Sequence, residues 1–283
     1  MRISIITINR NNCNGLRKTI ESVISQSTSP FEFIVIDGAS SDGSTNLLKE
    51  YSNAISYSVS EPDKGIYNAM NKGVVAAHGE YCLFLNSGDA LCHTEVLAQV
   101  KASGVESDII CGNAILQENP PKRKAAPTEI TLRFLYGGTL CHQAVFIKTT
   151  LLRKHPYNES LRIVADREFF LQCLIFESCS YQAVNIDICN YDITGFSAQN
   201  RFASEQEWQA VMQAHIPERI LIDYGQEVSG VLYGFSSYEK LFLEIGRRRW
   251  RKPVYWLVRS FLSCISVFIP SAKFVNLFPK YNK

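Results

Sequence analysis

The first hundred residues alternate short apolar runs with amphipathic segments, and this alternation limits the possible folds more than any other feature. Apolar runs of about four to eight residues between turn residues predict buried strands, and apolar residues three or four apart predict helices. A helix between two strands returns the chain across the sheet, so that the two strands lie parallel. The sequence therefore predicts an α/β fold, doubly wound around a mostly parallel sheet with flanking helices.

The predicted elements continue along the chain and become less regular in its second half. Strands are expected at 3–8, 31–37, 55–60, 81–85, 108–115, 141–148 and 181–192, helices at 14–26, 45–51, 66–77, 164–176 and 204–214, and loops at 118–127 and 194–203. Ligands of such sheets bind beyond the carboxyl ends of the strands. This rule places residues 7–10, Asp37 and residues 86–89 along one edge, which is the expected binding edge.

The glycine-rich phosphate loops of the common nucleotide-binding folds are missing from the sequence. It has no G-x-G-x-x-G after the first strand and no G-x-x-x-x-G-K-[ST] anywhere, which argues against a dinucleotide oxidoreductase or a P-loop enzyme. A nucleotide diphosphate then needs another counter-charge, and a divalent cation held by a few carboxylates supplies one. Asp89, in a small-residue turn after a buried strand, is the expected ligand; an ordinary turn is the alternative.

Four motifs follow one another in order along this edge. They are I-S-I-I-T-I-N-R at 3–10, I-V-I-D-G-A-S-S-D-G-S at 34–44, E-P-D-K-G-I-Y-N-A-M-N-K-G at 61–73 and G-E-Y-C-L-F-L-N-S-G-D at 79–89. Together they resemble the family 2 glycosyltransferases, inverting nucleotide-sugar enzymes of the GT-A fold. The variant motif L-N-S-G-D resembles that of the bacterial branch of the family, which builds capsule, O-antigen and colanic-acid-type polysaccharides. The resemblance covers roughly residues 1–200 and is densest in 1–90.

The resemblance implies a role for residues in each motif. It implies that the nucleotide-sugar donor is bound by Thr7, Asn9, Arg10, Asp37, Asp42, Lys64, Tyr67, Asn71 and Asn86. Within this set Asp37 matches the aspartate that hydrogen-bonds the base, and Asp89 matches the last aspartate of a D-x-D-like motif that holds Mn²⁺ or Mg²⁺. The commoner form of that motif is D-A-D-D, whose first and third positions are Asn86 and Gly88 here.

The segment at 159–170 resembles the part of the family that carries the catalytic base, which implies that role for Asp166. An inverting transfer needs one carboxylate near the acceptor hydroxyl, opposite the leaving diphosphate, to accept the proton. Glu168 lies two residues further on. Because residues two apart do not share a helix face, only one of these carboxylates is expected to point into the site.

Two further segments match parts of the family near the acceptor and the donor. C-H-Q-A-V-F at 141–146 matches a segment beside the acceptor site, where His142 contacts a phosphate or a sugar hydroxyl or plays a structural part. T-G-F-S at 194–197 resembles a mobile loop that closes over the donor. Arg201, close to that loop, is expected to help hold the diphosphate.

The charge of the chain is distributed unevenly. Residues 246–283 contain nine Lys or Arg and no Asp or Glu, whereas residues 1–245 carry a net charge of −7. The most apolar stretch there, 254–269, has 16 residues with Arg259 inside it, fewer than the roughly 20 that a spanning helix needs. Basic residues beside Trp and Phe on an amphipathic helix suit an anionic membrane surface. Packing of this helix on the body of the protein is the alternative, and nucleic acid is not an expected partner.

The cysteines and the first residues indicate the compartment. Nine scattered cysteines without a C-x-x-C pair favour reduced thiols in a cytoplasmic protein. The apolar run at 3–8 is too short for the core of a signal peptide. We therefore expect a cytoplasmic protein that is peripheral on the inner face of the plasma membrane.

Together with these patterns, the family resemblance implies a domain arrangement and a function. A GT-A domain is expected at 1–228, with a donor-binding half at 1–115 and an acceptor and catalytic half at 116–228, followed by a basic helical extension at 229–283. The leading hypothesis is transfer of a sugar from a UDP- or GDP-sugar to a polyprenyl-diphosphate-linked or oligosaccharide acceptor. A sugar-nucleotide pyrophosphorylase-like enzyme and a non-catalytic carbohydrate- or nucleotide-binding module on the same fold are the alternatives.

Overall fold

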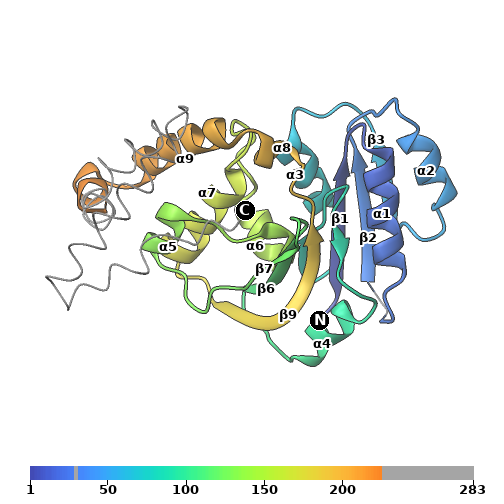
Figure 1. Cartoon of the computed structure of the whole chain (residues 1–283), viewed down its shortest axis with the longest axis horizontal. Helices are drawn as coiled ribbons and strands as arrows, with labels where there is room; N and C mark the ends of the chain where they lie inside the picture. Colours follow the sequence, from blue (N-terminus) through green and yellow to red (C-terminus); the bar gives the residue numbers. More distant parts are fainter. Residues whose placement is uncertain (29–30, 225–283) are drawn as a thin grey trace, which may run out of the picture. The chain divides into compact units, whose positions relative to one another are not determined.

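The computed structural model of the chain describes residues 1–28 and 31–224 (Figure 1). The chain divides into two compact units, Met1–His215 and Ile216–Lys283. The predicted domain boundary at 228 and the predicted extension at 229–283 lie outside the described residues. No helix in the described part of the chain is long and apolar enough to cross a membrane.

Four parallel strands form the first half of the sheet. In spatial order they are β3 (Tyr57–Ser60), β2 (Phe31–Asp37), β1 (Ile3–Asn9) and β4 (Tyr81–Phe84). Side chains of a strand alternate between the two faces of the sheet. On β1, Ile3 and Ile5 belong to the core that α1 (Cys13–Ile24) covers, whereas Ile6 faces α3 (Ile66–Ala76). Both faces of β1, β2 and β4 are largely buried, which is why these three strands are mostly apolar in sequence, whereas β3 at the edge of the sheet is mostly exposed.

The second half of the sheet mixes parallel and antiparallel pairs. It continues from β4 through β8 (Val145–Lys148), β6 (Ile109–Leu116) and β9 (Tyr181–Tyr191) to β5 (Ala90–Leu91), with β7 (Lys122–Lys124) beside β6. The pair β6–β9 is parallel, and the pairs β4–β8, β6–β8, β5–β9 and β6–β7 are antiparallel. The predicted α/β fold is confirmed, with its parallel order concentrated in the first half.

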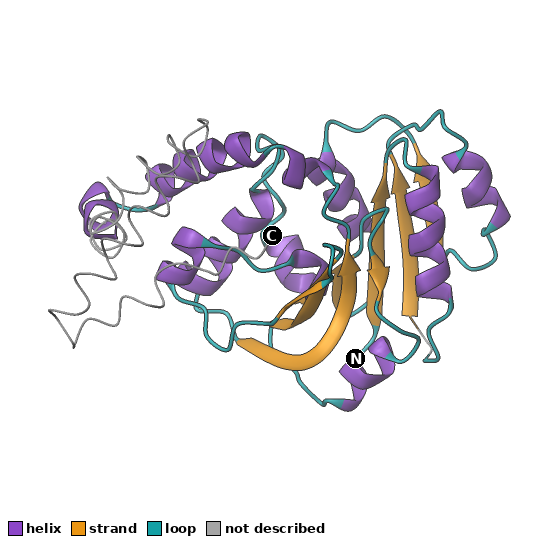
Figure 2. Ribbon diagram, viewed as in Figure 1, coloured by secondary structure: helices purple, strands orange, loops and turns teal. Residues whose placement is uncertain are grey.

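The sheet curls strongly. Only residues 85–89 separate β4 from β5, although three strands lie between them in the sheet. Neighbouring strands are about 4.8 Å apart, so a flat sheet would place β5 roughly 19 Å from β4. The linking turn is not extended, because the Asp89 N–H donates to the Asn86 carbonyl at 2.9 Å. Figure 2 shows the strong bend of β9, the strand with which β5 pairs.

Several predicted elements differ from the structure. The helix expected at 164–176 is α7 (Ala165–Phe170) followed by the π-helix η2 (Leu171–Phe176), and the strand expected at 141–148 starts with the 3₁₀ turn η1 (His142–Ala144). The expected loops contain β7, α8 (Phe196–Gln199) and the start of α9 (Arg201–His215). The remaining helices are α2 (Ser44–Glu50), α4 (Val96–Ala102), α5 (Leu132–Gly137) and α6 (Thr149–Lys154). Of these, α2 matches the helix expected at 45–51, whereas α4, α5 and α6 were not expected, because six or seven residues give little periodicity.

Candidate active site

The carboxyl ends of β1 and β2 meet at Asn9 and Asp37, which are partners in the strand register. The fully buried Asp37 carboxylate accepts hydrogen bonds from Asn9 Nδ2 at 2.7 Å, from the Ser40 hydroxyl at 2.6 Å and backbone at 2.9 Å, and from the Ser60 hydroxyl at 2.5 Å. Burial alone raises the pKa of Asp37, but these hydrogen bonds outweigh it and hold the pKa below its ordinary value. The predicted base-binding carboxylate is therefore ionised and held in place by the loop that follows it.

Thr7, Arg10 and Lys64 differ in their access to a ligand. Thr7 is fully buried, and its hydroxyl donates to the Leu85 carbonyl at 2.7 Å, so that it joins β1 to the end of β4. Arg10 is two-thirds exposed, with its guanidinium 3.9 Å from the Asp63 carboxylate. Lys64 is exposed as well. Of the three, only the two cations present their side chains to solvent.

Asp42 and Asn71 bind the protein's own backbone in this structure. The Asp42 carboxylate accepts from the backbone N–H groups of Cys13 at 2.7 Å and Ser44 at 3.1 Å, where α1 and α2 begin. The Asn71 side chain donates to the Tyr157 carbonyl and accepts from the Tyr157 N–H, both at 2.9 Å. Through these contacts both side chains stabilise the backbone next to the strand ends on which the other predicted residues lie.

The turn between β4 and β5 carries the predicted metal ligand. The Asp89 carboxylate is 3% exposed, and its Oδ1 accepts from the backbone N–H of Asp192 at 2.9 Å. Burial raises the pKa of Asp89 to about 6. In the same turn Asn86 Nδ2 lies 3.4 Å from His142 Nε2, and Asn86 Oδ1 is buried with no hydrogen-bond partner in the described part of the chain.

Asp166 lies in the first turn of α7 and is 8% exposed. Its Oδ2 lies 3.1 Å from His142 Nδ1, and its Oδ1 lies 3.0 Å from the Tyr67 hydroxyl. That hydroxyl is also 2.6 Å from the Ile163 carbonyl. His142 thus connects the predicted base to the 86–89 turn, while Tyr67, predicted to line the donor, hydrogen-bonds the base.

Each member of the His142–Asp166 pair favours the charged form of the other. Burial lowers the pKa of His142, but the hydrogen bond and charge of Asp166 outweigh it and raise the pKa above its ordinary value. Burial raises the pKa of Asp166, but the hydrogen bond and charge of His142, aided by Tyr67, hold it below its ordinary value. The pair is therefore an ion pair over a pH range wider than either group alone would give.

Replacing His142 by Asn should cost stability in a pH-dependent way. The raised pKa of folded His142 contributes stability that is complete below about pH 6.5 and is lost as the pH rises through that raised value. The lowered pKa of Asp166 contributes stability that is present above about pH 4 and is lost as the pH falls through that lowered value. Urea unfolding of both proteins between pH 5 and 9 should show their free-energy difference shrinking as the pH rises. A difference independent of pH would contradict the ion pair.

The structure separates the two carboxylates of α7. Asp166 points toward His142 and Tyr67, whereas Glu168 Oε1 lies 2.9 Å from His215 Nε2 at the end of α9. Glu168 therefore contacts α9 and is not brought to the predicted base. Arg201 begins α9, and its side chain lies outside what the structure describes.

Glu207 on α9 is a residue that the sequence did not single out. Its carboxylate accepts hydrogen bonds from three successive backbone N–H groups, those of Arg162 at 2.7 Å, Ile163 at 2.7 Å and Val164 at 2.9 Å. Val164 precedes α7 and has no side-chain cap of its own. Glu207 therefore fixes the segment that leads into Asp166. No motif or spacing in the sequence links it to that segment.

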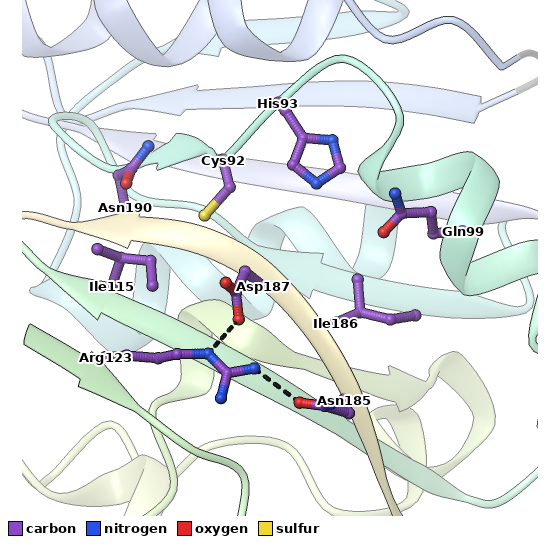
Figure 3. Close-up of a pocket in the computed structure, with 9 residues that line it drawn as sticks. All are labelled: Cys92, His93, Gln99, Ile115, Arg123, Asn185, Ile186, Asp187 and Asn190. Carbon is purple, nitrogen blue, oxygen red and sulfur yellow. Dashed lines mark hydrogen bonds and ion pairs between the residues drawn. The ribbon is translucent and has the colours of Figure 1, made fainter.

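An open pocket of 440 Å³ lies elsewhere, over β7 and β9 (Figure 3). Arg123 in this pocket donates to Asp187 at 2.6 Å and to Asn185 at 2.7 Å, so these three side chains bind one another. None of the predicted site residues lines this pocket. The geometry therefore points to the edge formed by the ends of β1, β2 and β4, together with α7, as the candidate active site.

This fold and the polar residues at its strand ends fit a glycosyltransferase, and sequence comparison agrees. The chain belongs to the family described as Glycosyl transferase family 2, whose model matches residues 4–163. "Uncharacterized glycosyltransferase Rv1514c" of Mycobacterium tuberculosis is 34% identical over 201 residues, which cover 68% of this chain and 76% of that protein. "PGL/p-HBAD biosynthesis glycosyltransferase" of Mycobacterium bovis is 28% identical over 199 residues, or 68% and 77% of the two chains. The family resemblance drawn from the four motifs is confirmed.

Solved structures share the fold at low sequence identity. S. aureus TarS 1–349 in complex with UDP-GlcNAc matches with a TM-score of 0.62 and 18% identity, covering 89% of this chain and 78% of that one. The mannosyltransferase PcManGT of Pyrobaculum calidifontis, in complex with GDP-Man and Mn²⁺, matches with a TM-score of 0.59 and 14% identity, covering 95% and 81%. These matches confirm the GT-A type of α/β fold.

Proposed function

We propose that this glycosyltransferase is inverting and metal-dependent, and moves a sugar from a UDP- or GDP-sugar to a lipid-linked or oligosaccharide acceptor in bacterial surface polysaccharide synthesis. The buried Asp166 carboxylate, held between His142 and Tyr67, is the observation that carries the proposal. The donor class is supported by the similar structures, which hold UDP, UDP-GlcNAc or GDP-Man.

The chemistry follows from the charge of Asp166. Its pKa lies below the ordinary value, so the carboxylate is ionised at neutral pH and can accept a proton. In the proposed step the acceptor hydroxyl oxygen bonds to the anomeric carbon, the bond from that carbon to the diphosphate oxygen breaks, and the hydroxyl proton passes to Asp166. Before the proton is transferred, His142 stabilises the ionised carboxylate through its contact with Asp166 Oδ2.

The residues of the 86–89 turn fit a hard divalent cation. Mn²⁺ and Mg²⁺ take carboxylate and amide oxygens, and one or two protein ligands suffice when a diphosphate supplies the others. The turn offers Asp89 and the buried Asn86 Oδ1, which has no hydrogen-bond partner among the described residues. No group of three or more His, Cys, Asp or Glu side chains suited to a metal occurs among residues 1–28 and 31–224. When bound, the cation would neutralise charge that develops on the leaving diphosphate.

A peripheral position on the inner face of the plasma membrane belongs to the same proposal. A polyprenyl-diphosphate acceptor is held in the bilayer, and residues 246–283 carry nine cationic side chains and no acidic one. Such a segment is attracted by anionic lipids. The structural account of this segment lies outside the described residues.

Thermal unfolding with nucleotides tests the proposal. UDP, GDP, CMP and dTDP, each with and without Mn²⁺, should give a metal-dependent stabilisation with UDP or GDP, about 2.7 kcal/mol at a concentration 100 times the dissociation constant. Incubation with the matching nucleotide-sugar and a lipid-linked acceptor should then release the nucleoside diphosphate. No stabilisation by any nucleotide would favour the non-catalytic module, and formation of a nucleoside triphosphate from added pyrophosphate would favour the pyrophosphorylase-like enzyme.

A further inference from the structure

Position 88 is the third position of the D-x-D-like motif, and its glycine is required by the backbone. Gly88 has a φ of +107°, a left-handed conformation that favours glycine over any other residue. A Cβ atom at this position would lie 2.9 Å from Asp192 Oδ2 and 3.6 Å from Asp192 Cβ. The space that an aspartate at 88 would use is therefore filled by a carboxylate from the residue that follows β9.

Asp192 is held in this position by two sets of contacts. Its backbone N–H donates to Asp89 Oδ1 at 2.9 Å, which ties the end of β9 to the 86–89 turn. Its Oδ1 accepts from the Thr194 backbone N–H at 2.8 Å and from the Thr194 hydroxyl at 2.7 Å. Within the described residues no hydrogen bond engages Oδ2, the oxygen that faces Gly88.

Besides Asp192 Oδ2, the 86–89 turn itself contains an oxygen that no hydrogen bond engages among the described residues. Asn86 Oδ1 is buried, and it has no partner in the part of the chain that the structure describes. A carboxylate oxygen and an amide oxygen are ligands that Mg²⁺ and Mn²⁺ take. Asp89, by contrast, uses Oδ1 for the Asp192 N–H, and its carboxylate also hydrogen-bonds the Gln143 side chain.

We infer that Asp192 supplies, from the end of β9, the cation-binding carboxylate that position 88 lacks, and that Asp89 positions Asp192. This inference rests on the proposed metal-dependent function. It names Asp192 as a site residue that the motif does not contain. The cation then contacts the 86–89 turn and the 192–194 segment together.

The test measures Mn²⁺ affinity by electron paramagnetic resonance on the full chain, at saturating concentration of the nucleoside diphosphate that stabilises the wild type. Substitution of a residue that only hydrogen-bonds a metal ligand weakens metal affinity by roughly tenfold or more. Asp192→Asn, which would remove a direct ligand, should weaken Mn²⁺ affinity at least that much. Asp192→Glu should keep most of the wild-type Mn²⁺ affinity. Asp187→Asn is the matched control, because Asp187 lies on β9 and pairs with Arg123 away from this turn. The control should bind Mn²⁺ like the wild type.

The outcomes separate this inference from the proposed function. Absence of metal-dependent nucleotide binding in the wild type would overturn both. Metal-dependent binding that Asp192→Asn leaves unchanged would overturn only the role of Asp192. If Asp192→Asn does not fold, Fe²⁺-catalysed oxidation of the wild-type chain should mark both 86–89 and 192–194 by mass spectrometry, and marks confined to 86–89 would overturn the inference.

Discussion

Asp166→Asn should lower kcat by about 100- to 10,000-fold, the range typical for loss of a general base, with nearly unchanged donor affinity. The amide keeps the size of the side chain but cannot accept a proton from the acceptor hydroxyl. Of the predicted donor residues Tyr67 contacts Asp166, whereas Asn9 and Asp37 lie at the ends of β1 and β2 and share no hydrogen bond with Asp166 among the described residues. Steady-state kinetics with labelled donor, together with calorimetric nucleotide binding, measures both quantities.

Glu168→Gln is the matched control for this experiment. The change is chemically similar and lies two residues away on α7, but Glu168 contacts His215 and not the predicted base. Its kcat should stay close to the wild-type value. Equal loss of nucleotide binding and turnover in Asp166→Asn would instead assign Asp166 a structural role.

Glu207→Ala should reduce both stability and turnover. Three backbone N–H groups at 162–164 lose a charged acceptor, and because they are partly exposed we expect a loss of about 1–3 kcal/mol in the free energy of unfolding. The segment that leads into Asp166 is then no longer fixed, so kcat should fall while the donor KM changes little. Urea unfolding and steady-state kinetics measure the two effects.

Two variants make the result for Glu207 specific. Glu207→Gln keeps one acceptor oxygen and should recover part of both stability and kcat. Glu205→Ala removes an exposed carboxylate from the same helix and should change neither. A Glu207→Ala protein with reduced stability but unchanged kcat would show that this contact supports the fold alone.

The first half of the fold was predictable because its strands are buried on both faces. β1, β2 and β4 lie within one residue of the predicted ranges, since helices cover both sides and most positions are apolar. The short α5 and α6, of six residues each, give no periodic signal. β7 is Lys-Arg-Lys, which reads as a loop, and only its pairing with β6 makes it a strand.

The site was predictable where its residues lie in contiguous motifs. Asp37, Asp89 and Asp166 were identified through a family resemblance, and their neighbours in sequence supplied the context. Asp192 and Glu207 were not, because their partners Gly88 and residues 162–164 are distant along the chain. Their roles depend on the bend of β9 and on the packing of α9 against α7, which no local pattern encodes.

The curl of the sheet has a consequence for the order in which parts of the protein fold during synthesis. The 86–89 turn emerges early during synthesis, but among the described strands β5, which follows it, pairs with β9 alone, through Ala90 with Asn190 and Leu91 with Cys189. A nascent chain that ends before residue 189 therefore holds the four parallel strands without the partner that fixes this turn. Closing so long a segment is slow compared with local pairing. The proposed metal site in this turn should accordingly form last, after both halves of the sheet have left the ribosome, and shorter nascent chains should not bind a nucleotide in a metal-dependent way.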